Sequence, residues 1–338
     1  MKFVLCHRMP ISAREDVVPL NRRVFSTSRT SFITLGKHIS HYLAMVVLAT
    51  ALLLLGTSFV LGGTTSSPPA HASGEKSRMR WHFQPIPEGD LYPVYIADPH
   101  HSSISVQLIS FERTEIFDSG NNRFGLKLGG RFGLFRVHPA DSPERGLQVG
   151  IEAGFIGQFD NDNSQDNIGW DGIYGLLFSL RANEVLALKF GALHTSSHIG
   201  DEYAERTGRR RINYTREEFL VGVSGEISER WRIYGEAAYG YRLRTKTVQK
   251  PGRVQLGVEY ESSPVLWKDR VGWYAAADGS AYEERNWDIN FSVQTGFAMR
   301  NNERTWRLGV EYYDGRSVMG EFFQDDERSI ALGLWLSL

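Results

Sequence analysis

Apolar and polar residues alternate along most of the chain from residue 102 onward, and turn residues separate the alternating stretches. Successive side chains of a β-strand point to opposite faces, so this period of two predicts strands rather than helices. The stretch 287–297 is typical, because its large apolar side chains alternate with small or polar ones. The pattern predicts twelve strands, near Ser102–Phe111, Phe124–Val137, Gly146–Gln158, Gly169–Leu180, Val185–Ser196, Ile212–Glu226, Trp231–Leu243, Val254–Ser262, Val271–Asp278, Trp287–Met299, Trp306–Tyr313 and Ile330–Leu338.

Three features of these stretches favour a membrane barrel over a soluble sandwich. Many strands have the ~9–11 residues needed to cross a bilayer at a tilt. The polar face carries more charged residues than a packed core could bury. Aromatic residues near strand ends suggest the girdles of an outer-membrane barrel, namely Trp170, Trp231, Tyr241, Tyr260, Trp287, Trp306 and Tyr312. We therefore predict an all-β fold, a closed antiparallel transmembrane β-barrel of about twelve strands over residues 102–338, because lipid cannot satisfy an open sheet edge.

Short connections alternate with long ones along the predicted barrel. Residues 181–184, 228–230 and 300–304 form tight turns, whereas 197–211 and 314–328 form long polar loops. Short periplasmic turns and long outer loops are typical of bacterial outer-membrane barrels. We therefore expect a location in the bacterial cell outer membrane, with both termini in the periplasm and the outer-membrane insertion machinery as a partner.

The N-terminal part carries one apolar segment, Leu43–Gly62, that is long enough to cross a bilayer as a helix. Basic residues precede it, and the small-residue motif ending at Ala72 follows it, as in a secretory signal. We predict a signal peptide with a long n-region over residues 1–72, cleaved after Ala72, and a periplasmic segment over residues 73–101. The alternatives are an uncleaved anchor and a true start codon further downstream.

Composition excludes several classes of function. The chain has 38 Lys and Arg against 39 Asp and Glu, a formal net charge of −1, so no basic surface for nucleic acid is expected. The mean hydropathy of −0.31 argues against a bundle of membrane helices. Cys6 is the only cysteine and lies in the predicted signal peptide. The mature chain would therefore hold no disulfide, zinc–cysteine site or cysteine nucleophile.

The apolar face of the predicted strand Val185–Ser196 continues into a histidine and a serine. Every second residue from Leu186 to Ala192 is apolar, and the same face then carries His194 and Ser196. Because this fifth strand is expected to run outward, both residues would lie near the outer membrane surface, on the lipid-facing side.

The next strand carries polar groups on the corresponding face. Its apolar positions continue backwards in register through Glu217, Thr215 and Asn213. Cross-strand neighbours have Cβ atoms about 5 Å apart. We expect His194 to pair with Glu217, and Ser196 with Thr215, which brings a histidine, a serine and an acid together on one surface.

These residue types can divide the tasks of acyl-transfer catalysis. Ser196 would be the nucleophile and His194 the general base, while Glu217 would orient the imidazole, with Asn213 as a second candidate for that position. The alternative is that His194 is an interfacial residue where lipid gives way to water, and that Ser196 only begins a polar loop.

A candidate metal site lies in the loop that follows. His198, Asp201 and Glu202 offer a ligand set that would suit calcium, the one cofactor that the sequence suggests. The alternative is a solvated loop. The basic run Arg209–Arg211 could meet lipid phosphates through charge-assisted hydrogen bonds, or it could be a solvated face.

The segment 192–203, ALHTSSHIGDEY, together with 211–217 and 96–99, resembles a bacterial outer-membrane family catalogued as domain of unknown function 1207. That resemblance covers most of the mature chain and implies an outer-membrane location. More distantly, the H-x-S pair is similar to those of outer membrane phospholipase A, a twelve-stranded barrel, and of the lipid A deacylases. This likeness implies a lipid-facing site at His194, Ser196 and a later Asn or Glu. Ser197 departs from the Asn that commonly follows the serine.

Two classes of function follow from these observations. The first is a lipid acyl hydrolase that acts on outer-leaflet phospholipid or lipid A, with membrane lipid or lipopolysaccharide as its partner. The second is a non-enzymatic barrel, either a narrow channel or a structural or surface-binding protein. The charges expected to face inward support the second class: Lys127, Glu152, Arg232, Glu236, Arg242, Arg253, Glu259, Arg307 and Glu311.

Overall fold

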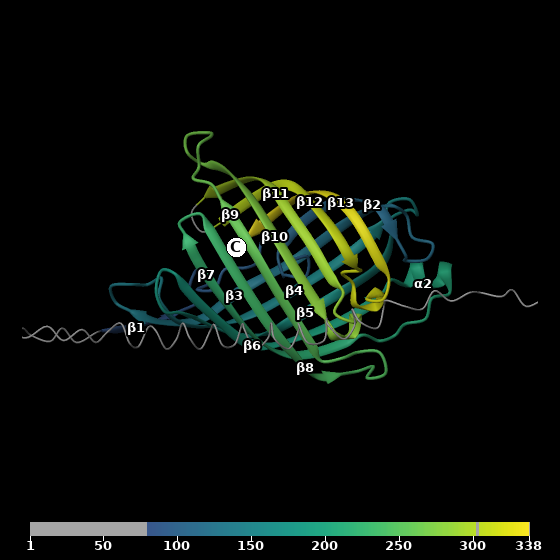
Figure 1. Ribbon diagram of the computed structural model, residues 1–338, viewed down its shortest axis with the longest axis horizontal. Helices are drawn as coiled ribbons and strands as arrows, with labels where there is room; N and C mark the ends of the chain where they lie inside the picture. The colour runs from purple at the N-terminus through teal and green to yellow at the C-terminus, as the bar shows by residue number, and fades with distance from the viewer. Residues whose placement is uncertain (1–79, 302–303, 338) are drawn as a thin grey trace, which may run out of the picture.

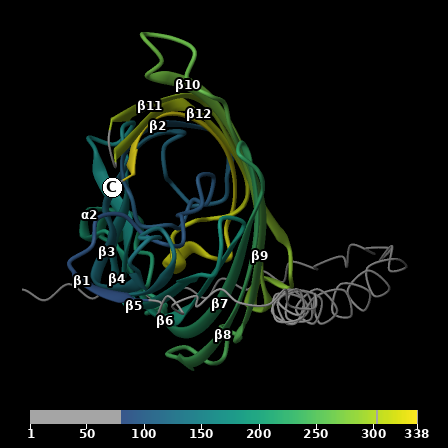
Figure 2. The ribbon, with the colours of Figure 1, turned by 90° about the vertical axis from the view of Figure 1, so that its left-hand side faces the viewer.

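The computed structural model describes residues 80–301 and 304–337. Twelve antiparallel strands, β2 to β13, form a closed barrel in which each strand pairs with the next and β13 pairs with β2 (Figures 1 and 2). The strands are β2 Ile104–Thr114, β3 Asn122–Pro139, β4 Gly146–Asp160, β5 Asp166–Arg181, β6 Leu186–Ile199, β7 Thr215–Ser228, β8 Trp231–Leu243, β9 Gly252–Glu261, β10 Val271–Tyr282, β11 Ile289–Asn301, β12 Arg304–Arg316 and β13 Asp326–Ser337. The predicted closed barrel is confirmed, while the predicted signal peptide and its cleavage site lie outside the described residues.

Four short elements complete the fold and were not predicted. Strand β1, Trp81–Pro85, pairs with the last residues of β3. Helix α2, Asp201–Thr207, and the 3-10 helices η1, Glu283–Arg285, and η2, Gly320–Phe322, lie in loops at one end of the barrel. We call this the loop end, and it is the end predicted to face outside the cell. Within the described part of the chain, no helix is long and apolar enough to cross a membrane.

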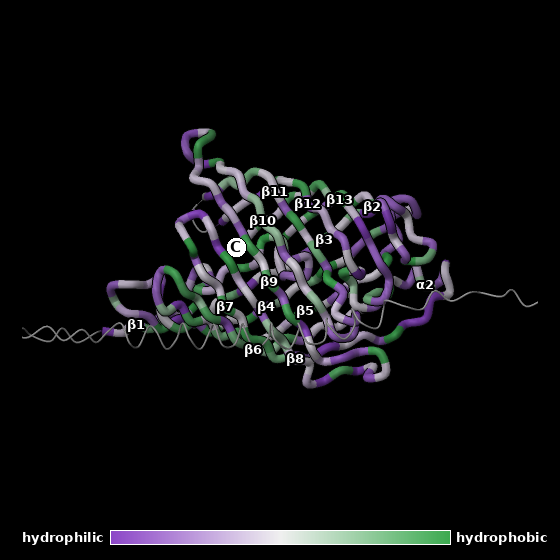
Figure 3. Tube along the Cα trace, in the orientation of Figure 1, coloured by the Kyte–Doolittle hydropathy of each residue, from purple (hydrophilic) through white to green (hydrophobic). Residues whose placement is uncertain are grey.

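Apolar and polar residues alternate along the strands (Figure 3), and the apolar ones are exposed on the outer face while the polar ones are buried in the lumen. In β13, Leu332 is 53% exposed on the outer face, whereas its neighbour Ala331 is buried inside. In β11, Phe291 faces outward and Gln294 is buried in the lumen, as the alternation predicts. Because successive side chains point to opposite faces, the alternation of apolar and polar residues determines which face of each strand meets lipid.

The lumen is filled by the segment that joins β1 to β2, residues 86–103. Figure 2 shows this stretch inside the ring of strands. Tyr92 and Tyr95 are fully buried there and share a hydrogen bond of 2.7 Å. Tyr95 donates to Glu236, and the backbone N–H of Ile96 donates to Glu259. We call this segment the plug. The predicted periplasmic segment 73–101 therefore ends inside the barrel.

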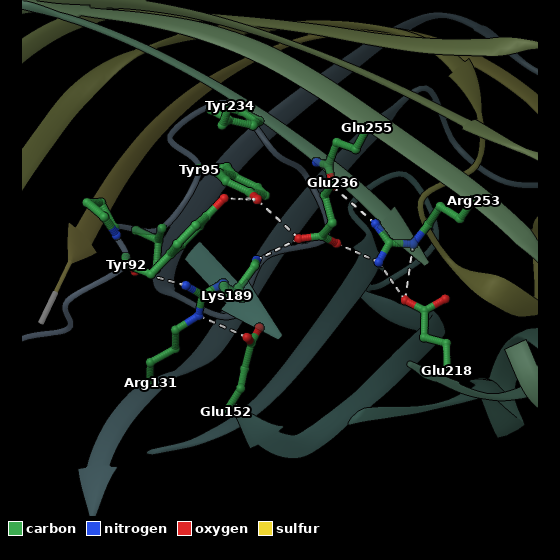
Figure 4. Close-up of polar contacts among 12 residues, drawn as sticks. Tyr92, Tyr95, Arg131, Glu152, Lys189, Glu218, Tyr234, Glu236, Arg253 and Gln255 are labelled. Atoms are coloured by element: carbon green, nitrogen blue, oxygen red, sulfur yellow. Dashed lines mark hydrogen bonds and ion pairs between the residues drawn. The ribbon is translucent and has the colours of Figure 1, made fainter. Parts of the chain in front are cut away.

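Ion pairs between strands hold the charges of the lumen (Figure 4). Lys189 and Arg253 both bind Glu236, with N–O distances of 2.6 and 2.7 Å. Arg131 binds Glu152 at 2.9 Å. A charge buried inside a barrel is costly unless it is paired, so the lumen can hold these charges only because their partners stand on neighbouring strands or on the plug.

One charge of the predicted inward set lies on the wrong side. The guanidinium of Arg242 is on the outer surface, with 77% of its side chain exposed. A β-bulge between Glu217 and Glu218 shifts the register of β7 against β8, so that Glu217 pairs with Arg242 and Glu218 with Gly240. One extra residue in a strand reverses the facing of those that follow. The other predicted inward charges are buried in the lumen.

The loop end is closed by an apolar cluster. Met319 and Phe322, from the loop between β12 and β13, pack against Ile168, Ile199 and Tyr203. The backbone N–H of Gly320 donates to Asp171, which also accepts a hydrogen bond from Ser197. The plug and this loop enter the lumen from opposite ends, and a cavity of about 350 Å³ remains between the plug and the wall.

The facing of the strands can be tested by placing a charge on either side of the wall. We expect Leu332→Arg to cost about 2–4 kcal/mol of folding free energy, because Leu332 lies midway along a lipid-facing strand. Gln294→Arg should cost less, since Gln294 lies 3.0 Å from Glu311, which could pair with the new guanidinium. Urea unfolding of the barrel in lipid vesicles measures both. Equal losses for the two variants would contradict the assigned faces.

Candidate active site on the outer surface

The register between β6 and β7 is the predicted one. His194 pairs with Glu217 and Ser196 pairs with Thr215. On β6, Lys189 and Ser197 are buried in the lumen. Because His194 and Ser196 have the opposite parity, they lie on the outer surface, near the loop end of the strand.

The imidazole of His194 is held between a carboxylate and an aromatic ring. Its Nδ1 lies 3.5 Å from Oε1 of Glu217, and the two side chains are only 21% and 19% exposed. The ring stacks on Tyr174 of β5 with 4.5 Å between ring centroids. Glu217 also meets Arg242 at 3.5 Å. With Nδ1 directed to the carboxylate, Nε2 is left for proton transfer.

Ser196 lies on the same face as this pair and lines the same cavity. Among the described residues, its hydroxyl makes no hydrogen bond to His194. Residues two apart on one strand are separated by about 6.6 Å along the backbone. A rotation of the two side chains toward each other would therefore have to precede proton transfer, and such hydrogen bonds often tighten only when substrate binds. Both residues line a cavity of about 570 Å³ on the outer surface.

Asn213 lines the same cavity but does not belong to the strand. Strand β7 begins at Thr215, three residues after the predicted start, and Asn213 has a left-handed backbone with φ of 57°. The cause is a carboxylate from the facing loop: Glu321 accepts hydrogen bonds from the backbone N–H groups of Ile212 and Tyr214. Those groups are therefore not available for strand pairing.

The structure does not gather the predicted metal ligands. His198 stacks on Trp170 with 4.1 Å between ring centroids, and its Nδ1 lies 2.9 Å from Arg211. Asp201 and Glu202 are exposed in the first turn of α2. No group of three His, Cys, Asp or Glu residues close enough to hold a metal ion occurs in the described part of the chain. A calcium site here stays a prediction.

The basic run 209–211 is partly engaged within the protein. Arg209 binds Asp325 at 2.6 Å, and its guanidinium lies over the ring of Phe322. Burial raises the pKa of the Asp325 carboxyl above its ordinary value, against the opposing effect of Arg209. Arg209 therefore fastens one loop to another, whereas Arg211 lines the outer cavity.

Two neighbours of the site were missed by the sequence analysis. Tyr174 lies opposite His194 on β5, so its outward parity and the pairing of β5 with β6 could have revealed it. Arg242 could not have been found in this way, since a strict alternation places it in the lumen and only the bulge brings it to Glu217.

The fold defines the class of protein. A closed twelve-stranded antiparallel barrel with an apolar outer face is a β-barrel of the bacterial outer membrane. The chain belongs to the family described as protein of unknown function (DUF1207), whose model matches residues 69–336. No curated protein matches the chain.

Solved structures with the same fold include outer membrane phospholipase A. The Escherichia coli structure is 9% identical, with a TM-score of 0.51, and the match covers 71% of this chain and 94% of that one. The Salmonella typhi phospholipase, a dimer with bound calcium, is 10% identical with a TM-score of 0.51, covering 73% and 95%. An active-site mutant of the E. coli protein is 12% identical with a TM-score of 0.52, covering 72% and 92%. At these identities the likeness shows the fold alone.

Replacement of a carboxylate by its amide should affect the folding free energy differently at Glu217, on the outer surface, and at Glu236, in the lumen. We expect Glu217→Gln to cost about 0–1 kcal/mol of folding free energy, because its ion pairs lie on the surface. Glu236→Gln should cost about 3–5 kcal/mol, because it leaves Lys189 without its buried partner. Urea unfolding measures both variants. A large loss from Glu217→Gln would show that the site is part of the structural framework.

Proposed function

We propose that this protein hydrolyses an acyl ester of an anionic lipid in the outer leaflet. Ser196 is the nucleophile, His194 the general base, and Glu217 orients the imidazole. The observation that carries the proposal is the contact between His194 and Glu217 across two strands, on the same lipid-facing surface as Ser196. Asn213 lines the cavity and remains the second candidate for the orienting position.

The reaction follows from these positions. Ser196 Oγ attacks the ester carbonyl while His194 takes its proton, and the imidazolium is stabilised by the Glu217 carboxylate. The imidazolium then gives the proton to the leaving alkoxide, which departs as the alcohol and leaves an acyl group on Ser196. Water attacks this acyl group with His194 again as the base. Fatty acid and free Ser196 are the products.

The cationic side chains of the cavity indicate the substrate class. Arg211, Arg242 and Arg244 line it together with the His–Ser–Glu set. Guanidinium groups bind phosphate through charge-assisted, often bidentate hydrogen bonds. Phospholipid and lipid A both carry phosphate beside their acyl esters, and both can approach a site on the barrel wall from within the leaflet.

The filled lumen supports a function on the outer surface. The plug and the loop between β12 and β13 occupy much of the interior, and hydrogen bonds to Glu236 and Glu259 and an ion pair between Asp90 and Arg131 fasten the plug to the wall. This arrangement disfavours an open channel. The proposed reaction is also the one that the name of the similarly folded outer membrane phospholipase A states for that protein.

Hydrolysis is tested by incubating the purified barrel, with calcium present, with labelled phospholipid or lipid A and by measuring released fatty acid. We expect Ser196→Ala and His194→Ala each to lower the rate on the order of 10³-fold or more, without a further loss in the double variant, because the two residues act as a unit. Glu217→Gln should lower the rate less than Ser196→Ala or His194→Ala if Asn213 shares the orienting role.

The matched control is Ser110→Ala, since Ser110 is an exposed residue of β2 away from the site. It should retain the wild-type rate. Wild-type protein that releases no fatty acid from either lipid would refute hydrolysis and leave a non-enzymatic surface-binding role.

Substrate charge is tested separately at Arg244. We expect Arg244→Gln to raise KM for an anionic phospholipid while kcat stays near the wild-type value, because the phosphate is bound equally in the ground state and the transition state. The measurement compares phosphatidylglycerol with neutral diacylglycerol in mixed micelles. An equal change of KM for both lipids would contradict phosphate recognition by this residue.

A further inference from the structure

Arg285 stands apart from the other arginines of the lumen. It ends the 3-10 helix η1 and is only 4% exposed. Its Nε and Nη1 atoms are buried and have no hydrogen-bond partner, and no carboxylate forms an ion pair with it among the described residues. By contrast, six other arginines of the lumen each donate to a carboxylate: Arg123, Arg131, Arg216, Arg232, Arg253 and Arg307.

Among the described residues, the guanidinium of Arg285 makes a cation–π contact that does not use its N–H groups. The group lies over the ring of Tyr282, with 4.3 Å from Cζ to the ring centroid. A cation over an aromatic face is attracted by the ring, but the N–H donors of a planar guanidinium point outward in its own plane. These donors therefore still need an acceptor.

The position of Arg285 is fixed by its neighbours. Glu284 accepts hydrogen bonds from the hydroxyl of Tyr214 and from Arg216, which holds η1 at the inner side of the loop end. The backbone N–H of Asp288 donates to the carbonyl of Arg285. The side chain is thus held in the barrel, away from bulk solvent.

Arg285 lines an internal cavity of about 80 Å³ between the plug and the loop end. His100, Ser280 and Tyr282 line the same space. About 10–15 Å³ is enough for the centre of one water molecule, so this cavity can hold a small polyatomic ion. Figure 4 shows the neighbouring ion pairs of the lumen, in which Arg253 and Glu218 are already joined.

The carboxylates of this cavity are bound to other groups. Asp171 accepts hydrogen bonds from Ser197 and from the backbone of Gly320. Asp98 accepts the backbone N–H of His100. Glu152, Glu218 and Glu236 bind the cations Arg131, Arg253 and Lys189. None of these carboxylates forms an ion pair with Arg285 in the described structure.

We propose that the lumen binds a small inorganic anion, chloride or phosphate, on the guanidinium of Arg285. A buried cation without a partner is strongly destabilising, and buried polar groups in proteins almost always have a partner. An anion in the cavity would accept a hydrogen bond from one of the buried N–H groups of Arg285, and His100 and Tyr282 could bind its other side. The site lies inside the barrel, whereas the proposed ester hydrolysis takes place on the outer surface, so each can fail without the other.

The proposal is tested with the whole barrel in detergent at constant ionic strength, in chloride, phosphate or gluconate. Gluconate serves as the anion that is too large for the cavity. We expect the melting temperature to rise with the logarithm of the chloride or phosphate concentration and to stay unchanged in gluconate, because a ligand that binds only the folded state stabilises it by mass action. The stronger of the two responses identifies the anion.

Two variants assign the response to this residue. Arg285→Gln should abolish the anion dependence, whereas the matched control Arg210→Gln, an exposed loop change, should keep it in full. Arg285→Lys should retain a response to chloride but lose most of the response to phosphate, because lysine lacks the planar fork. If Arg285→Gln fails to fold, crystals of the wild-type protein are soaked in bromide. Anomalous scattering then shows whether a halide ion lies at the guanidinium of Arg285.

Three results would overturn the proposal. The first is a wild-type melting temperature that is the same in all three salts, as expected for a cavity that holds only water. The second is an anion dependence that persists in Arg285→Gln. The third is a guanidinium of Arg285 that shows neither anomalous scattering in crystals soaked in bromide nor phosphate density in crystals soaked in phosphate.

Discussion

The closure of β13 onto β2 is the constraint on which the rest of the structure depends. Lipid offers no hydrogen bonds, so every backbone N–H and C=O within the membrane must pair with another strand. Each of the strands β2 to β13 pairs with two neighbours, from Ile104 in the first strand to Leu336 in the last. The sheet of the barrel therefore has no free edge in the membrane. Once the sheet is closed, each side chain faces either lipid or lumen, and the period of two decides which.

This division sends the charges of the strands inward and determines what the lumen can contain. The ion pairs of Arg131, Lys189 and Arg253 join adjacent or next-but-one strands, so they bind the inner side of the wall together. The plug completes this network, because Tyr95 and the backbone of Ile96 occupy acceptors on Glu236 and Glu259. A lumen built in this way stabilises the barrel, and only the outer surface meets lipid.

Alternation alone was sufficient to predict all twelve barrel strands and the pairing of His194 with Glu217, because facing and register depend on local parity. It could not predict the plug, since residues 86–103 have no periodic pattern and are held by contacts with distant strands. The bulge beside Glu217 was also hidden, and with it the true facing of Arg242. The left-handed Asn213 depends on Glu321, a residue from a loop more than a hundred positions away.

Strand β6 shows how one segment can serve both sides of the wall. Lys189 and Ser197 point inward and bind Glu236 and Asp171, so the strand is fixed by buried contacts. His194 and Ser196 point outward and carry none of these contacts, so they can change without disturbing the barrel. A reactive pair needs a rigid backbone beneath it and side chains that are free to move. The buried contacts on the inner face of the strand fix its backbone, while the outer face leaves the side chains of the pair free. The same separation places the buried guanidinium of Arg285 on the side of the wall that lipid does not reach.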